Sequence, residues 1–206
     1  MPSPAHGLTQ PERVETSRRR LLQAAAELIV EKGWDATTAA EIGRRAGYSR
    51  AMVHARYGSK DAILESFLHE HVKRLNPDPD AKTSGMDQVL AHFDRIEEIY
   101  TEDHELLLAM FVATFEAVKT TSPLRERVRD QLRNGAEKVE MGLRKGIRDG
   151  SVRSGIDIAR AVNDISTAVF GIAFCWTALS DQYDLGRELT SVRARIVENY
   201  GGPALD

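Results

Sequence analysis

The segment Ser49–Lys60, SRAMVHARYGSK, combines cationic side chains with small and apolar ones. Arg50 and His54 are four residues apart, so in a helix they share one face. Ala51 and Ala55 add small side chains that let a helix backbone approach the edges of bases. Arginine can bind guanine through two hydrogen bonds, and alanine can contact the methyl group of thymine. The segment is therefore a candidate DNA-reading helix.

Two short helices joined by a glycine turn are predicted around this segment. Thr38 and Glu41 form a capping box that starts the first helix, and Gly47 ends it. Ser49 caps the second helix, which closes at Gly58. This arrangement is a helix-turn-helix, in which the second helix enters the major groove of DNA.

Groups that bind phosphate are expected on both sides of this motif. Thr38 and Lys60 lie at predicted helix N-termini, where backbone N–H groups and the helix dipole favour an anion. Arg44 and Arg45, on the preceding helix, can extend toward the DNA backbone.

The charge of the chain is uneven, although its net value is only −3 at pH 7. Residues 13–60 hold ten basic and five acidic residues, whereas residues 61–206 hold 18 basic and 25 acidic residues. A basic segment on an acidic body favours contact of the first part with a polyanion. The alternative is a small helical unit with a solvated basic face.

Composition and pattern predict an all-α protein in two parts. Hydrophobic residues make up 42% of the chain and charged residues 29%, as in soluble globular proteins. We expect a flexible tail over residues 1–16, a helix-turn-helix domain over 17–59, a connecting helix over 60–75 and a larger helical domain over 76–206. The single cysteine, Cys175, allows neither an intramolecular disulfide nor a cysteine zinc cluster. No signal sequence or membrane-length apolar segment is recognised, which favours a cytoplasmic protein without membrane contact.

Enzymatic motifs are not recognised in the sequence. Glu65, His69 and His71 could approach a metal from one helix, but further ligands at a recognisable spacing are missing. We therefore predict surface histidines, no metal, no cofactor and no catalytic residues.

The segment Thr38–Lys60, TAAEIGRRAGYSRAMVHARYGSK, resembles the DNA-binding signature of the TetR family of bacterial transcriptional repressors. The preceding LLQAAAELIVEKGWDATT and the following DAILESF resemble the flanking helices of that family, so the likeness covers roughly residues 17–72. It implies phosphate contacts at Thr38, Tyr57 and Lys60, with Arg50, Ala51 and His54 nearest the groove. The full set of candidate DNA contacts is Thr38, Arg44, Arg45, Ser49, Arg50, Ala51, His54, Arg56, Tyr57 and Lys60.

The sequence departs from the family pattern at three of these positions. The family usually has tyrosine at the position of His54, and histidine or tyrosine followed by phenylalanine at those of Arg56 and Tyr57. The bases that this helix reads are therefore the least transferable part of the resemblance.

Apolar residues recur in steps of three and four along the last two predicted helices, as in helices that pack lengthwise on another helix. They could form intramolecular core. The TetR resemblance implies instead that these helices form a four-helix dimer interface. The candidate interface residues are Ile158, Val162, Ile165, Val169, Ile172, Leu189, Val192 and Ile196.

The helices between residues 86 and 148 are expected to enclose a pocket for a small, largely apolar effector with one or two polar groups. Plain core packing is the alternative for each candidate residue. These candidates are His92, Phe93, Met110, Phe111, Phe115, Glu116, Cys175 and Trp176.

The sequence thus predicts a homodimeric DNA-binding regulator, a repressor released from a palindromic operator by a small apolar ligand. Two alternatives stay open, namely a ligand-dependent transcriptional activator and a helical protein-interaction module that does not bind DNA.

Overall fold

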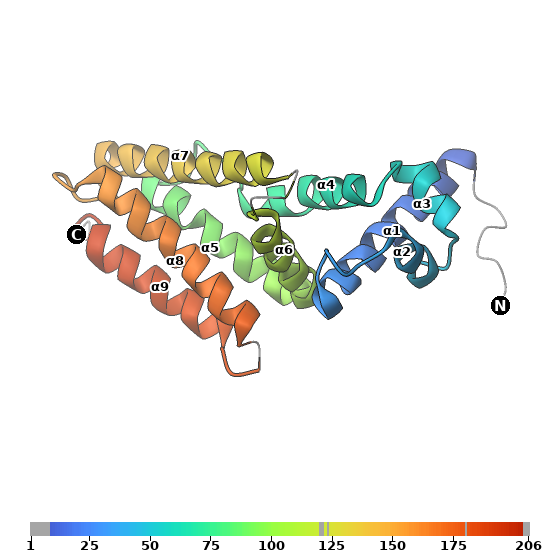
Figure 1. The fold of residues 1–206 in the computed structure, drawn as a ribbon. Helices are drawn as coiled ribbons and strands as arrows, with labels where there is room; N and C mark the ends of the chain where they lie inside the picture. Colours follow the sequence, from blue (N-terminus) through green and yellow to red (C-terminus); the bar gives the residue numbers. More distant parts are fainter. Residues whose placement is uncertain (1–8, 120–121, 123, 180, 204–206) are drawn as a thin grey trace.

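The computed structural model describes residues 9–119, 122, 124–179 and 181–203, and the regular secondary structure within these ranges is entirely helical (Figure 1). The predicted all-α class is confirmed. The elements are α1 (Gln10–Lys32), α2 (Ala39–Arg45), α3 (Arg50–Tyr57), α4 (Lys60–Glu70), the 3-10 helix η1 (Val72–Leu75), α5 (Gly85–Glu102), α6 (His104–Ala117), α7 (Arg125–Asp149), α8 (Ile158–Ala178) and α9 (Leu185–Tyr200).

Helix α1 begins earlier than its apolar pattern predicts. Thr9 accepts a hydrogen bond from the backbone N–H of Glu12, the Glu12 carboxylate accepts one from the Thr9 N–H at 2.7 Å, and Pro11 lies in the first turn. This capping box starts the helix without large apolar residues. The predicted tail is therefore wrong from Thr9 onward, while residues 1–8 of that prediction lie outside the described residues.

The predicted caps of the helix-turn-helix are confirmed. Thr38 and Glu41 form the capping box of α2, Ser49 accepts from the N–H of Met52 at the start of α3, and Ser59 caps α4. Because each cap depends on residues two or three positions apart, local sequence is sufficient to place it.

The connecting helix predicted over residues 60–75 is not continuous. Helix α4 ends at Glu70, and after His71 the chain continues as the 3-10 helix η1. Helix α7 has Leu124 at its N-cap position and no side-chain cap hydrogen bond.

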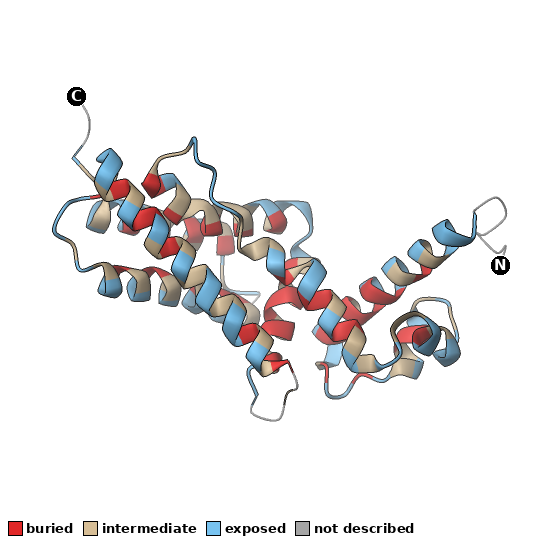
Figure 2. Ribbon diagram, turned by 90° about the horizontal axis from the view of Figure 1, so that it is seen from above, coloured by how far each residue is buried: buried red, intermediate tan, exposed pale blue. Residues whose placement is uncertain are grey.

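The larger unit is built around α5, which packs against α7 on one side and α9 on another, while α8 contacts α6, α7 and α9. Gly85 and Gly146 allow α5 and α7 to approach closely, because a Cβ atom at Gly85 would lie 2.0 Å from the backbone nitrogen of Gly146. The helix-turn-helix lies at the opposite end of an elongated molecule, and α1 and α4 connect it to this bundle (Figure 1). Buried residues follow the inward faces of these helices (Figure 2).

Candidate nucleic-acid interface and ligand cavity

The outer face of α3 has the residues that the sequence predicts there. Arg50, Ala51, His54 and Ala55 are exposed, whereas Val53 is fully buried against the small core of the motif. The face is thus small and cationic on the side that points away from the protein.

His54 has one ring nitrogen committed to the end of its own helix. Its Nδ1 lies 2.7 Å from the carbonyl oxygen of Gly58. A carbonyl oxygen can only accept, so Nδ1 carries the proton, and Nε2 of the neutral ring is left as an acceptor. Arg44 and Arg50 are both exposed and make no ion pair within the described parts of the chain.

Arg56 and Tyr57 hold α3 against α1. Nε of Arg56 donates to Oγ of Ser17 at 2.7 Å, and the Tyr57 hydroxyl donates to the carbonyl oxygen of Arg18 at 3.1 Å. The Arg18 guanidinium lies 4.7 Å from the centre of the Tyr57 ring, and burial raises the pKa of Tyr57 to about 12. Both side chains therefore have a structural role that the sequence did not reveal, and their contacts with phosphate stay predictions.

Lys60 also forms bonds within the protein. Its Nζ donates to the carbonyl oxygens of Trp34 at 2.6 Å and Thr37 at 2.8 Å, and lies 4.7 Å from the centre of the Trp34 ring. The N-terminus of α4 is thereby bonded to the loop between α1 and α2. The phosphate contact predicted at Lys60 therefore depends on its backbone N–H and on the hydrogen-bonding capacity that its ammonium group keeps after these two bonds.

Arg45 faces α1 rather than open solvent. Its guanidinium pairs with Glu27 at 3.2 Å and Glu31 at 2.7 Å, and these hydrogen bonds raise the pKa of Arg45 and lower that of Glu31. Arg44 is therefore the better placed of the two arginines for contact outside the chain.

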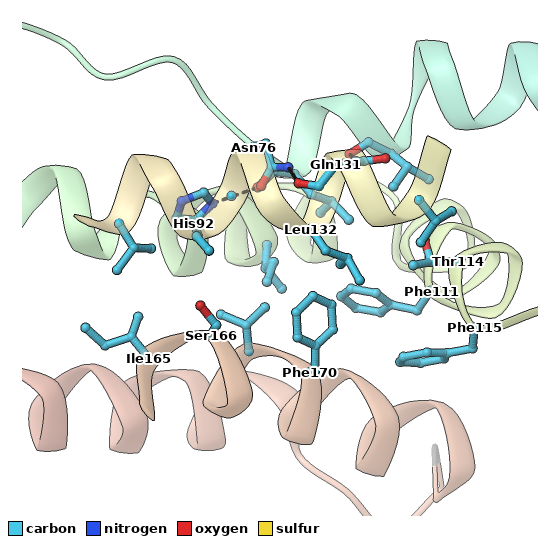
Figure 3. A pocket seen from close by; sticks show the side chains of 18 residues that line it. Asn76, His92, Phe111, Thr114, Phe115, Gln131, Leu132, Ile165, Ser166 and Phe170 are labelled. Atoms are coloured by element: carbon cyan, nitrogen blue, oxygen red, sulfur yellow. Dashed lines mark hydrogen bonds between the residues drawn. The ribbon is translucent and has the colours of Figure 1, made fainter. Parts of the chain in front are cut away.

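A cavity of about 80 Å³ lies between η1, α5, α6, α7 and α8 (Figure 3). His92, Phe111 and Phe115 line it, as predicted. Phe93, Met110, Glu116, Cys175 and Trp176 are absent from the lining of this cavity, so their role in ligand binding stays a prediction. Phe93 and Met110 are fully buried in the core, and Trp176 faces a larger hollow of about 1170 Å³ between the two units.

The cavity wall is mostly apolar and includes no charged side chain. Its five polar side chains are those of Asn76, His92, Thr114, Gln131 and Ser166. Of these, only His92 and Thr114 are buried, each with less than a tenth of its surface exposed. The helices between residues 86 and 148 were expected to enclose the pocket, but sequence periodicity did not single out the residues of α7 that line it, nor those of η1, which lies before this range.

Glu116 belongs to the junction between the two units. One of its carboxylate oxygens accepts a hydrogen bond from the backbone N–H of Trp34 at 2.5 Å, and Lys119, just after the end of α6, pairs with Asp35 at 2.8 Å. Helix α6 therefore carries cavity residues in its middle and holds the helix-turn-helix unit at its C-terminal end.

The predicted dimer residues mostly face the core. Of these, Ile165, Ile172, Leu189, Val192 and Ile196 are at most 6% exposed, so that assignment is wrong. Val169 and Ile165 line the cavity, and Ile158 and Val162 are half-buried against the core. The regular spacing of apolar residues shows which face of each helix is packed. It does not show whether that face packs within the chain or against a second copy.

Several apolar side chains on and beside these helices are exposed. Phe170 and Phe174 of α8 are 37% and 61% exposed, Leu179 directly after α8 is 46% exposed, and Val197 of α9 is 45% exposed. Phe170 also lines the cavity, and the Phe174 ring lies 5.9 Å from that of Phe115. Helix α8 is also long and apolar enough to span a membrane by length and composition, with 22% of its most apolar window buried. An exposed aromatic face on a long helix is typical of an interaction surface.

Two of the candidate metal ligands bind an arginine instead. Arg127 of α7 donates to Glu65 at 2.6 Å and to Nδ1 of His69 at 2.8 Å. The ring of His71 lies against that of Phe67 in a tilted arrangement, with ring centres 5.0 Å apart. Within the described ranges, no cluster of three or more His, Cys, Asp or Glu side chains could hold a metal ion.

Comparison with known proteins places the helix-turn-helix in a regulatory context. The profile of a family described as "Bacterial regulatory proteins, tetR family" matches residues 21–67. An uncharacterised HTH-type transcriptional regulator of Mycobacterium tuberculosis (strain ATCC 25618 / H37Rv) is 31% identical over 140 residues, which are 66% of this chain and 69% of that protein.

Two solved structures share the fold of nearly the whole chain. SmeT, the repressor of the Stenotrophomonas maltophilia multidrug efflux pump SmeDEF, was solved with triclosan; it has a TM-score of 0.75 at 22% identity, covering 91% of this chain and 93% of its own. FadR of Bacillus subtilis with stearoyl-CoA has a TM-score of 0.71 at 22% identity, covering 87% and 97%. At this identity the likeness concerns the fold alone.

The structural role of Lys60 can be separated from that of an exposed cation. We expect Lys60→Met to lower the urea midpoint and Tm, since losing the donor to two carbonyl oxygens costs about 1–3 kcal/mol. Arg44→Met should change stability by less than about 0.5 kcal/mol. Both are measured by urea and thermal unfolding at one fixed protein concentration, and equal losses in the two variants would contradict this division.

Proposed function

Because this chain belongs to the TetR family of bacterial transcriptional regulators, we propose that it is a homodimeric repressor released from its operator by a ligand in the cavity. The observation that carries the proposal is the exposed face of α3, where Arg50, Ala51 and His54 combine hydrogen-bonding capacity with small size.

DNA recognition follows from the geometry of this face. Arg50, near the N-terminus of α3, is the candidate reader of guanine, and His54 presents Nε2 one turn further along. Arg44 and the N–H groups at the N-termini of α2 and α4 are candidates for phosphate. A single eight-residue helix reads few bases, so specificity requires a second copy on a half-site about 34–36 Å away or at a multiple of one helical turn.

The second copy is proposed to bind at the outward faces of α8 and α9. Phe174 is 61% exposed although it lies within a regular helix, and Phe170 and Leu179 nearby in the sequence are also exposed. Val197 of α9 is exposed as well, nearer the other end of α8, because Tyr200 of α9 bonds to Asp164. Burying such side chains in a dimer is favourable by about 25 cal/mol per Å² of apolar surface.

Effector binding is proposed to act through α6. Phe111, Thr114 and Phe115 line the cavity, and the next residue, Glu116, accepts from the N–H of Trp34 in the DNA-binding unit. A ligand that moves the α6 side chains would therefore act directly on the contact between the units. If the ligand binds one arrangement of the two units more tightly than the other by about 1–3 kcal/mol, the affinity for the operator changes roughly 5–150-fold.

The ligands named for SmeT and FadR, triclosan and stearoyl-CoA, support a cavity that accepts apolar molecules. A repressor of this kind acts on chromosomal DNA, so we place the protein in the cytoplasm. The exposed apolar face of α8 is accordingly assigned to protein contact rather than to a lipid bilayer.

Operator binding is tested with duplexes from the region upstream of the protein's own gene. We expect a palindromic site to be protected and log K to fall linearly with log salt as phosphates are neutralised. Arg50→Ala should cost about 1–3 kcal/mol and change the preferred bases at one position in each half-site.

Arg133→Ala, on α7 and 60% exposed, is the matched loss of an arginine and should leave operator binding unchanged. Lack of binding at low salt, or equal losses for both variants, would refute the assignment to α3. Transcription in vitro from the same duplex separates repression from activation.

The dimer interface is tested by placing a charge at its proposed centre. Phe174→Glu should convert the protein to a monomer in sedimentation velocity and weaken operator binding strongly, because a carboxylate would be buried without a partner. Met141→Glu, at a similarly exposed apolar position on α7, should stay dimeric. A dimer that survives Phe174→Glu would move the interface elsewhere.

A further inference from the structure

We propose that the cavity selects an uncharged, largely apolar molecule that donates one hydrogen bond, such as a phenol or an alcohol, to Nε2 of His92. This proposal rests on the function proposed above, since it specifies the ligand of the same cavity.

Three side chains around the cavity donate hydrogen bonds within the protein. Nδ2 of Asn76 donates to the carbonyl oxygen of Gln131 at 3.1 Å, and Nε2 of Gln131 donates to that of Val72 at 2.7 Å. The Thr114 hydroxyl donates to the carbonyl oxygen of Met110 at 2.8 Å. Asn76 and Gln131 each retain one amide N–H and the amide oxygen, Thr114 retains acceptor capacity, and Ser166 adds a hydroxyl group that can donate or accept.

His92 is the most constrained of the polar lining residues. It is only 7% exposed, and its Nδ1 lies 3.2 Å from the carbonyl oxygen of Leu75. Because that oxygen can only accept, Nδ1 carries the hydrogen, and Nε2 of the neutral ring is an acceptor. Burial lowers the pKa of His92, which keeps the ring neutral. Nε2 makes no hydrogen bond to the described residues, and a hydrogen-bond donor on the ligand would give this acceptor a partner.

The cavity does not offer a counter-ion to a charged ligand. Its lining residues are all uncharged. The nearby ammonium group of Lys138 donates to the carbonyl oxygens of Asn76 and Pro77 at 2.9 Å and 3.2 Å and pairs with Asp78 at 2.9 Å, outside the lining. A carboxylate or ammonium group in the cavity would lose its hydration without gaining a partner.

The two ends of the cavity differ in chemistry. His92 and Ser166 lie toward one end in Figure 3, and Phe111, Phe115 and Phe170 toward the other. A ligand with its hydroxyl at His92 thus places its apolar body against three aromatic rings. At about 80 Å³ the cavity is smaller than the roughly 150 Å³ engineered cavity that binds benzene, so a ligand with even a single ring requires the lining side chains to move apart.

The experiment uses three probes on the full-length protein. 4-Propylphenol donates a hydrogen bond, 4-propyltoluene replaces its hydroxyl by a methyl group, and 4-propylbenzoate carries a charge. Binding is measured by calorimetry for the wild type, for His92→Phe, and for His92→Gln, which retains an acceptor. The 15N resonance of His92 Nε2 is followed in the wild type, so the test does not depend on a variant that folds.

We expect the preference for 4-propylphenol over 4-propyltoluene to fall by about fivefold to tenfold in His92→Phe, and to recover partly in His92→Gln. The Nε2 resonance should move with 4-propylphenol and stay in place with 4-propyltoluene. The proposal is overturned if the phenol does not bind, if the preference survives His92→Phe with an unmoved resonance, or if the benzoate binds as tightly.

Operator affinity is measured separately with each probe. Donor-dependent binding that leaves operator affinity unchanged would support this ligand class and overturn the proposed release mechanism. Operator release by 4-propyltoluene as efficient as by 4-propylphenol would support the release mechanism and overturn this ligand class.

Discussion

The backbone of Trp34 is the point on which the relation between the two units depends. Its N–H donates to Glu116 of α6, and its carbonyl oxygen accepts from Lys60 at the start of α4. One residue is thus held both by α6 of the bundle and by the start of α4. The φ angle of +78° at Gly33 turns the chain toward this contact, and a Cβ atom there would lie 2.5 Å from the Glu116 carboxylate.

This contact explains why charged residues of the helix-turn-helix were difficult to interpret from sequence. Lys60 has the position and charge of a phosphate ligand, yet its hydrogen-bond partners lie 26 and 23 residues away. Arg56 similarly binds Ser17, 39 residues earlier. Charge and helix position are local properties that sequence reveals, whereas such pairings depend on how distant helices pack. The caps at Thr38 and Ser49 were predictable because their partners are three residues away.

The same distinction separates the predictions for the larger unit. The spacing of Ile165, Ile172 and Val192 correctly indicates faces that pack lengthwise, but the structure buries these residues within one chain. The apolar residues that stay exposed, among them Phe174, do not stand out in the sequence from the apolar residues that the chain buries. In the cavity, His92, Phe111 and Phe115 were predictable as polar or apolar positions on α5 and α6, whereas Asn76 reaches it from the residue after η1 and Gln131 from α7.

Helix α1 also has a mechanical consequence. Trp34 follows its C-terminal end, and Ser17 and Arg18, which hold α3, lie near the other end. At 1.5 Å per residue, the stretch between Ser17 and Gly33 is about 24 Å long. Helix α1 is therefore a lever arm, and a rotation of about 5° at the Trp34 end displaces the far end by roughly 2 Å. A small rotation at the Trp34 end of α1 therefore moves the DNA-binding end by a distance that is large for a contact with a base pair.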